Sequence, residues 1–205
     1  MNARKPIPGL EVIRAEIQAS IAAKQRVLAD DALLLQLSSL AYVCVAALRA
    51  GGKVIFAGNG GSFADAQHLS AEFTSRFMFD RAPLASLALG TNNSAISAIG
   101  NDYGYEQVFA RELQGIAQAA DVFVPISTSG NSVNILAAVK VASSMKIATI
   151  AWTGESGGQL RELCECVRIP SQETARIQEC HILIGHILCG LVEAAYFENK
   201  SKTYE

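Results

Sequence analysis

The sequence predicts an α/β fold, a doubly wound five-stranded parallel sheet flanked by helices, with a helix pair before it. Two observations lead to this prediction. Short, continuous apolar runs alternate with segments of helical periodicity, as expected for parallel strands that are buried on both faces. In addition, half of the 205 residues are hydrophobic, which is enough for a substantial core in one domain.

The first fifty residues predict two helices that contribute to packing and oligomerisation. Apolar residues recur at three- and four-residue intervals from Leu10 to Ile21, and 33–48 is apolar on more than one face. Gly51-Gly52 is a clear C-terminal stop. Because a helix that is apolar on several faces must bury more than one side, this pair indicates contacts between subunits.

Strands and helices then alternate along the rest of a single domain that spans 1–205. We expect strands at 53–57, 85–89, 121–126, 146–152 and 166–169, and helices at 63–77, 94–99, 105–118, 132–144, 157–163 and 175–197. The α/β core therefore covers 51–197, and the polar tail 198–205 is expected to fray. Ligands of such sheets collect at the carboxyl ends of the strands.

Composition argues against several classes of partner. The formal charge of −2 and the pI near 5.9 give no general attraction to nucleic acid or anionic lipid. The polar start, 1–6, has no secretory pattern, and the apolar run 182–192 is too short for a membrane span. Five cysteines without a Cys-x-x-Cys pair are typical of reduced thiols, so we expect a cytoplasmic chain.

The stretch 54–72 combines an anion site with a pair of metal ligands. A β-branched run ends in Gly58-Asn59-Gly60-Gly61-Ser62 and opens into a helix, which gathers backbone N–H groups and a positive helix end around one point. His68 and Glu72 follow, four residues apart. They project from one helix face and are able to share a divalent metal ion.

A second loop, 127–132, has the composition of a phosphate site. Four hydroxyls, Gly130 and the start of the helix at 132 form a neutral site rich in donors. A helix N-cap alone would need only one of these polar residues. The glycines of a third loop, 153–158, instead indicate a tight turn, and the lack of lysine there excludes a nucleotide P-loop.

Two further places carry polar residues whose roles the pattern leaves open. His181 is either a core residue or part of a site, and Gln178 and His186 differ by about 80° and about 12 Å on an ideal helix. Both therefore lean towards one ion, or they belong to sites in different subunits. Asn101-Asp102 marks a turn before the helix at 105, where Asp102 is either an N-cap or a substrate contact.

Taken together, these motifs resemble the sugar isomerase (SIS) family of phosphosugar-binding domains over nearly the whole chain. The most specific segments are 58–62, 65–68, 100–104, 127–132 and 176–179 with His186. The resemblance implies the SIS fold, a homotetramer with active sites between subunits, and one Zn²⁺ per subunit. One departure is Ala175, where some members have an acidic residue, with Glu173 close by.

The resemblance also implies a role for each matching residue. Zinc ligands are expected at His68, Glu72, Gln178 and His186, with Glu72 and His186 also catalytic and Arg76 assisting. Substrate contacts are expected at Asn59, Gly60, Gly61, Glu72, Asn101, Asp102, Ser127, Thr128, Ser129, Ser132 and Gln178, of which the four hydroxyls hold phosphate.

The implied reaction interconverts D-sedoheptulose 7-phosphate and D-glycero-D-manno-heptose 7-phosphate through a metal-assisted enediol. This reaction is the first step of nucleotide-activated heptose synthesis, which supplies glycans such as lipopolysaccharide. One alternative is a non-catalytic SIS tetramer that binds the bacterial replication initiator, and another is an isomerase of pentose or hexose phosphates. All four expected zinc ligands are present, which favours the isomerisation of sedoheptulose 7-phosphate. We therefore expect a phosphorylated seven-carbon sugar as partner.

Overall fold

The computed structural model describes residues 9–197. The described helices are α1 (Leu10–Leu28), α2 (Asp31–Arg49), α3 (Gly61–Thr74), α4 (Asn93–Tyr103), α5 (Val108–Ile116), α6 (Val133–Ser144) and α7 (Thr174–Tyr196), with short 3₁₀ turns η1 (Tyr105–Gln107) and η2 (Leu160–Glu162). The strands are β1 (Val54–Gly58), β2 (Ser86–Ala88), β3 (Val122–Ile126), β4 (Ala148–Gly154) and β5 (Glu165–Ile169). The residues 1–6 and the tail 198–205, about which the sequence made predictions, lie outside this range.

The five strands form one parallel sheet in the order β2-β1-β3-β4-β5. Strand β1 pairs with β3 along its whole length, from Val54 opposite Val122 to Gly58 opposite Ile126. Because all strands run the same way, the loops that follow β1, β3 and β4 lie at one edge of the sheet. From β1 the chain first adds β2 on one side and then returns to add β3 on the other side. Doubly wound sheets bind their ligands at such a reversal, which here lies between β1 and β3.

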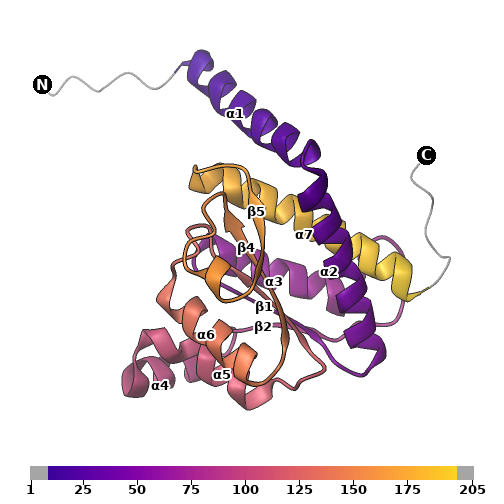
Figure 1. Cartoon of the computed structure of the whole chain (residues 1–205), viewed down its shortest axis with the longest axis vertical. Helices are drawn as coiled ribbons and strands as arrows, with labels where there is room; N and C mark the ends of the chain where they lie inside the picture. The colour runs from indigo at the N-terminus through magenta and orange to yellow at the C-terminus, as the bar shows by residue number, and fades with distance from the viewer. Residues whose placement is uncertain (1–8, 198–205) are drawn as a thin grey trace, which may run out of the picture.

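Two apolar cores cover the two faces of the sheet. Alternate residues of β1 point to opposite faces, so that Val54 and Phe56 join α1, α2, α3 and α7, whereas Ile55 and Ala57 join α5 and α6. Figure 1 shows α2, α3 and α7 on one side of the sheet, with α4, α5 and α6 on the other. The predicted doubly wound fold with its N-terminal helix pair is confirmed.

The structure corrects three of the expected helices. The segment 157–163 contains only the 3₁₀ turn η2, because Gly157 and Gly158 both have positive φ and form a turn. Helix α4 extends to Tyr103, so it includes residues that we expected in a turn. Helix α3 ends at Thr74, three residues before the predicted end, and the segment after it is irregular.

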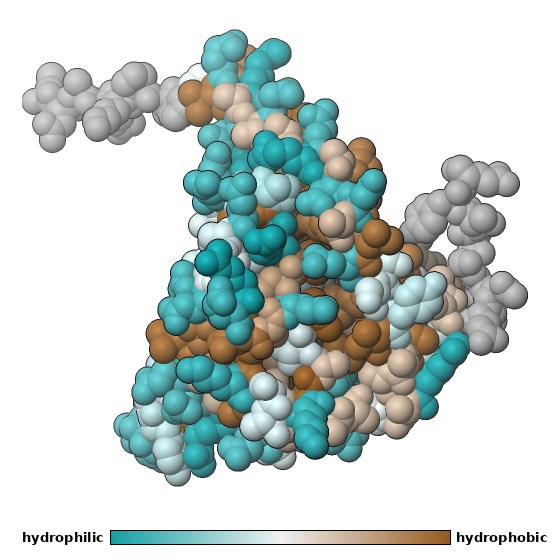
Figure 2. Space-filling view, in the orientation of Figure 1, coloured by the Kyte–Doolittle hydropathy of each residue, from teal (hydrophilic) through white to brown (hydrophobic). Residues whose placement is uncertain are grey.

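The N-terminal helix α1 extends away from the rest of the chain in Figure 1. Only Ala23 and Val27 of this helix are buried, whereas its apolar residues Leu10, Val12, Ile13, Ile17 and Ile21 are exposed. Brown, apolar surface is visible around α1 and α2 in Figure 2. Within one protomer this helix therefore has an apolar face without a partner.

Helices α2 and α7 are each long and apolar enough to cross a membrane by length and composition alone. In their most apolar windows 44% and 50% of the residues are buried inside the fold. Buried helices of a protein core commonly pass the same test, and both of these helices contribute to the core that covers one sheet face.

Candidate metal and sugar-phosphate site

Helices α3 and α7 bring two imidazoles and one carboxylate together. His68 Nε2 lies 2.9 Å from His186 Nε2 and 3.2 Å from Glu72 Oε1. All three ligand atoms lie within 4.8 Å of one another. His68 and Glu72 are one helical turn apart, as the sequence predicted, while His186 comes from 118 residues further along the chain.

The chemistry of this cluster fits a zinc ion. Neutral imidazole nitrogens and a carboxylate oxygen are ligands that Zn²⁺ accepts, and a catalytic zinc site commonly has three protein ligands with one open position. Zinc bonds of about 2.0–2.1 Å in a tetrahedral arrangement place the ligand atoms about 3.3 Å apart. The two short distances around His68 are close to this value, so small side-chain movements are enough to admit the ion.

Gln178 lies away from this cluster in the same chain. Its amide packs against the start of α3, since a Cβ atom added to Gly61 would lie 2.7 Å from Gln178 Nε2. His186, two turns further along α7, contacts His68, two turns further along α3. The two helices therefore run in the same direction with matching offsets, and the eight residues from Gln178 to His186 correspond to about 12 Å of rise along α7.

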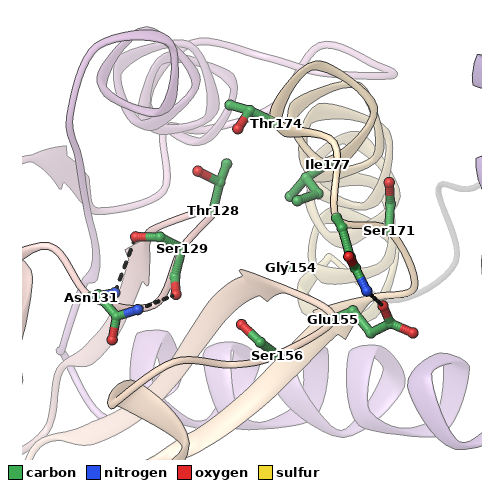
Figure 3. A pocket seen from close by; sticks show the side chains of 10 residues that line it. Thr128, Ser129, Asn131, Gly154, Glu155, Ser156, Ser171, Thr174 and Ile177 are labelled. Atoms are coloured by element: carbon green, nitrogen blue, oxygen red, sulfur yellow. Dashed lines mark hydrogen bonds between the residues drawn. The ribbon is translucent and has the colours of Figure 1, made fainter.

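A pocket of about 520 Å³ opens at the carboxyl edge of the sheet. It lies between the loop after β3, the loop after β4 and the start of α7, and Figure 3 shows Thr128 and Ser129 on one side with Thr174 and Ile177 opposite. Its other lining residues are Asn131, Gly154, Glu155, Ser156, Ser171 and Gln172. The pocket has the polar lining that a phosphate or a sugar hydroxyl requires.

Of the four predicted phosphate hydroxyls, two line this pocket and two bind each other. Ser127 Oγ lies 3.0 Å from Ser132 Oγ, so these two hydroxyls bond across the ends of the loop. The loop itself is held by Asn131, whose amide donates to Ser129 O and accepts from Gln159 N. These contacts fix the loop in one conformation, which favours binding because little ordering is left for the ligand to induce.

Asn59 has a partner that the sequence analysis did not single out. The amides of Asn59 and Asn134 exchange two hydrogen bonds of 2.9 Å each, and Tyr105 donates to Asn59 Oδ1 at 3.3 Å. Asn134 is buried in the first turn of α6, directly after the serine loop. It therefore ties the loop after β1 to the loop after β3. The only sequence signal for it was its place next to Ser132 and Val133.

The structure places Asn101 and Asp102 differently from the sequence prediction. Both lie in the last turn of α4, not in a turn before a helix, and Gly104 is the residue that caps the next helical segment. Their exposed side chains bond each other, with Asn101 Nδ2 donating to Asp102 Oδ1 at 2.8 Å. Asp102 is therefore not the N-cap, and its contact with substrate stays a prediction.

Four other residues of the predicted motifs have defined surroundings. His181 is a core residue: it is fully buried, and this burial lowers its pKa to about 4. Asp65, one turn before His68 on α3, has a buried oxygen without a partner among the described residues, and burial raises its pKa to about 6. Arg76 is exposed just beyond the end of α3. Gly60, before α3, has a φ of 55°, which glycine adopts without strain.

Comparison with known proteins shows the family of the chain. The SIS domain family matches residues 17–154. A phosphoheptose isomerase from Aneurinibacillus thermoaerophilus is 50% identical over 191 residues, which cover 93% of this chain and 96% of that protein.

Two solved structures are also similar over most of their length. A phosphoheptose isomerase from Francisella tularensis has a TM-score of 0.86 and 37% identity, covering 91% of this chain and 98% of its own. A phosphoheptose isomerase from Neisseria gonorrhoeae has a TM-score of 0.83 and 40% identity, covering 90% and 98%. The family match and the sequence identity to relatives over nearly the whole chain show that the chain belongs to the phosphoheptose isomerases of the SIS domain family.

Proposed function

We propose that this enzyme converts D-sedoheptulose 7-phosphate into D-glycero-D-manno-heptose 7-phosphate. The proposal is supported chiefly by the cluster of His68, Glu72 and His186 on α3 and α7. A hydroxyl-lined pocket at the carboxyl edge of the sheet offers a binding place for the phosphate end of a sugar. The reaction moves a proton between C1 and C2 through an enediol, and its barrier is the poor acidity of a carbon next to a carbonyl.

The cofactor we propose is one zinc ion per subunit, held by His68, Glu72 and His186. When bound, zinc supplies a Lewis acid that polarises the oxygens at C1 and C2. His68 is half-exposed and contacts both of the other ligands, so it is central to the set. The arrangement leaves a position for a further ligand, as in catalytic zinc sites.

Glu72 is the base we propose for the carbon-bound proton. Its Oε1 atom faces His68, whereas its Oε2 atom makes no hydrogen bond within residues 9–197 and is free to accept a proton. Glu72 removes the proton from C1 and returns it to C2, while His186 exchanges a proton with the sugar oxygens from the other side. The serine loop acts differently: it anchors the phosphate, so that remote binding energy fixes the reacting carbons in place.

We also propose that the active site is completed between the subunits of a homotetramer. Gln178 packs against Gly61 of its own chain, about 12 Å along α7 from His186. An amide ligand from the same chain would have to cross that distance, whereas one from a neighbouring subunit would not. The exposed apolar side chains of α1 give such a neighbour a surface to cover. Light scattering on the purified protein would give the mass of the assembly.

The cytoplasm is the compartment we propose. All five cysteines are free thiols, which is usual where the cell keeps thiols reduced. The product would then enter the synthesis of nucleotide-activated heptose.

One experiment tests the reaction directly. Zinc-loaded protein is incubated with D-sedoheptulose 7-phosphate, and the anomeric proton of the aldose is followed by NMR. Unphosphorylated sedoheptulose is the matched substrate control, and we expect it to react far more slowly because the anchor is missing. Folded, zinc-loaded protein that produces no aldose would contradict the proposal and would favour the non-catalytic alternative.

A further inference from the structure

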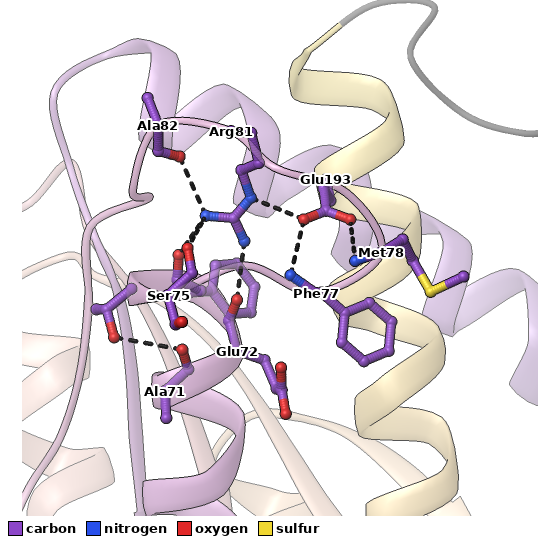
Figure 4. Close-up of polar contacts among 10 residues, drawn as sticks. Ala71, Glu72, Ser75, Phe77, Met78, Arg81, Ala82 and Glu193 are labelled. Carbon is purple, nitrogen blue, oxygen red and sulfur yellow. Dashed lines mark hydrogen bonds and ion pairs between the residues drawn. The ribbon is translucent and has the colours of Figure 1, made fainter.

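A buried ion pair joins α7 to the segment after α3. Arg81 Nε lies 2.7 Å from Glu193 Oε1, and the two side chains are only 2% and 1% exposed. The Glu193 carboxylate also accepts the backbone N–H groups of Phe77, at 3.0 Å, and of Met78, at 2.8 Å. Figure 4 shows the carboxylate between the guanidinium and these two amides. We call Arg81 and Glu193 the clamp.

The guanidinium of the clamp holds the C-terminal end of α3. Its Nη1 atom donates to the carbonyls of Phe73 at 2.7 Å, Ser75 at 3.0 Å and Ala82 at 3.1 Å, and its Nη2 atom donates to the carbonyl of Glu72 at 2.8 Å. The last carbonyls of a helix otherwise lack partners. The clamp therefore fixes the backbone of the residue that carries the proposed base.

Phe77 connects the clamp to the imidazole of His186. Its backbone N–H binds Glu193, and its ring stacks on His186 with 5.7 Å between the ring centroids and 19° between the planes. His186 lies two turns before Glu193 on the same face of α7. The ring torsion of histidine is soft, so a stacked neighbour limits the orientations of the imidazole.

The charged groups of the clamp hold backbone groups in a defined geometry, which is a role beyond stabilising the fold. A buried ion pair loses its hydration, and a well-packed apolar pair often stabilises a fold as much or more. Only a fork of N–H donors and a carboxylate, however, can hold several backbone groups at fixed angles. This clamp binds two amides and four carbonyls of one segment, all within ten residues of Glu72.

We propose that Arg81 and Glu193 are positioning residues for the metal site, acting on His186 through Phe77 and on Glu72 through its backbone. The proposal rests on the proposed function, which it extends to residues that touch neither metal nor substrate. It requires that loss of the clamp loosens the ligands without changing the phosphate loop, which lies at the other end of α7.

The chain offers a matched control for a test. Asp121 is also fully buried, and its carboxylate accepts the backbone N–H groups of Lys53 and Gln118 and pairs with Lys53 Nζ at 2.7 Å. It lies before β3, at the opposite edge of the sheet from the site. Asp121→Asn therefore removes the same kind of buried interaction as Glu193→Gln, but far from the metal ligands.

Wild type, Glu193→Gln and Asp121→Asn are compared for zinc affinity, by competition with a chromophoric chelator, and for kcat and KM with the sugar phosphate. We expect Glu193→Gln to weaken zinc binding by about 10- to 100-fold and to lower kcat, with KM within about twofold of wild type. Asp121→Asn should lose similar thermal stability and keep wild-type zinc affinity and kcat. Equal zinc affinity in the two variants would overturn the positioning role.

A second variant keeps the test decisive if Glu193→Gln does not fold. Phe77→Leu removes only the stacked ring, and we expect it to weaken zinc binding in folded protein, whereas unchanged zinc affinity would overturn the role of Phe77. If the wild type binds zinc but does not turn over the sugar, the proposed function fails. The zinc affinities of the variants would then still show whether Arg81 and Glu193 position the metal ligands.

Discussion

Replacing Gly130 with alanine would add one methyl group to the serine loop at its closest approach to another loop. Gly130 has a φ of 67°, in the left-handed region, and it packs against the turn after β4. A Cβ atom there would lie 2.1 Å from the carbonyl oxygen of Gly157 and 2.8 Å from the amide nitrogen of Gly158. Both contacts are with backbone atoms, which cannot rotate away.

The cost of this change has two parts. The left-handed conformation costs a residue with a side chain about 1–2 kcal/mol. Forcing two loops apart adds an overpacking term of about 1–3 kcal/mol. Since ordinary carbon contacts begin near 3.4 Å, the loops must separate by more than an ångström, and this breaks the hydrogen bond from Leu160 N to Gly130 O. We expect the free energy of unfolding to fall by about 2–5 kcal/mol.

Urea unfolding and steady-state kinetics measure the two consequences. We expect Gly130→Ala to raise the KM for the sugar phosphate by about tenfold or more, with a smaller change in kcat, because in our proposal the loop holds the phosphate and not the reacting carbons. Gly115→Ala is the matched control: its added Cβ meets nothing within 4 Å in α5, and we expect a stabilisation of about 0.5–1 kcal/mol. Wild-type KM and stability in Gly130→Ala would refute the reasoning.

Three further changes test other parts of the site and core. Glu72→Gln should lower kcat by about 10² or more while substrate still binds, and near-normal turnover in kinetic assays would remove Glu72 from the base role. Ser129→Ala should raise KM for the phosphorylated sugar, and an unchanged KM would argue against our placement of the phosphate. Burial lowers the pKa of His181 from 6.5 to about 4, so the unfolded chain binds more protons between these values. Stability should be complete above pH 6.5 and fall as the pH drops through 4, by up to about 3 kcal/mol in urea titrations, with a flatter profile in His181→Gln.

The fold was predictable because its signals are local. The apolar run 54–58 must be buried on both faces, and β1 is indeed an interior strand whose residues are all buried. The predictions failed where the backbone conformation of a few residues decides whether a segment forms a helix or a turn. The segment 157–163 looked helical, but two adjacent glycines with positive φ turn the chain and leave only η2. Glycine permits such a turn without requiring it, so composition could not distinguish a turn from a helix in this segment.

Only the part of the site that lies on a single helix could be predicted from residue spacing. His68 and Glu72 share a helix, so their spacing alone put them on one face, and their side chains do meet. His186 joins them because α3 and α7 run in the same direction side by side, a relation between elements that spacing within either helix does not contain. The same relation keeps Gln178 beside Gly61, about two helical turns before His186 on α7.

Asn134 and the clamp show why the supporting residues escaped prediction. Asn134 pairs with a residue 75 positions away, and Glu193 pairs with one 112 positions away. In the sequence, one is a polar residue at a helix start and the other an acidic residue near a helix end, which are ordinary places for both. Their burial distinguishes them, because a polar group enclosed by protein must have partners. Residues that bind a ligand share a recognisable chemistry, whereas residues that hold them in place share only a position in space, so the second kind follows only from the packing of segments that are distant in the sequence.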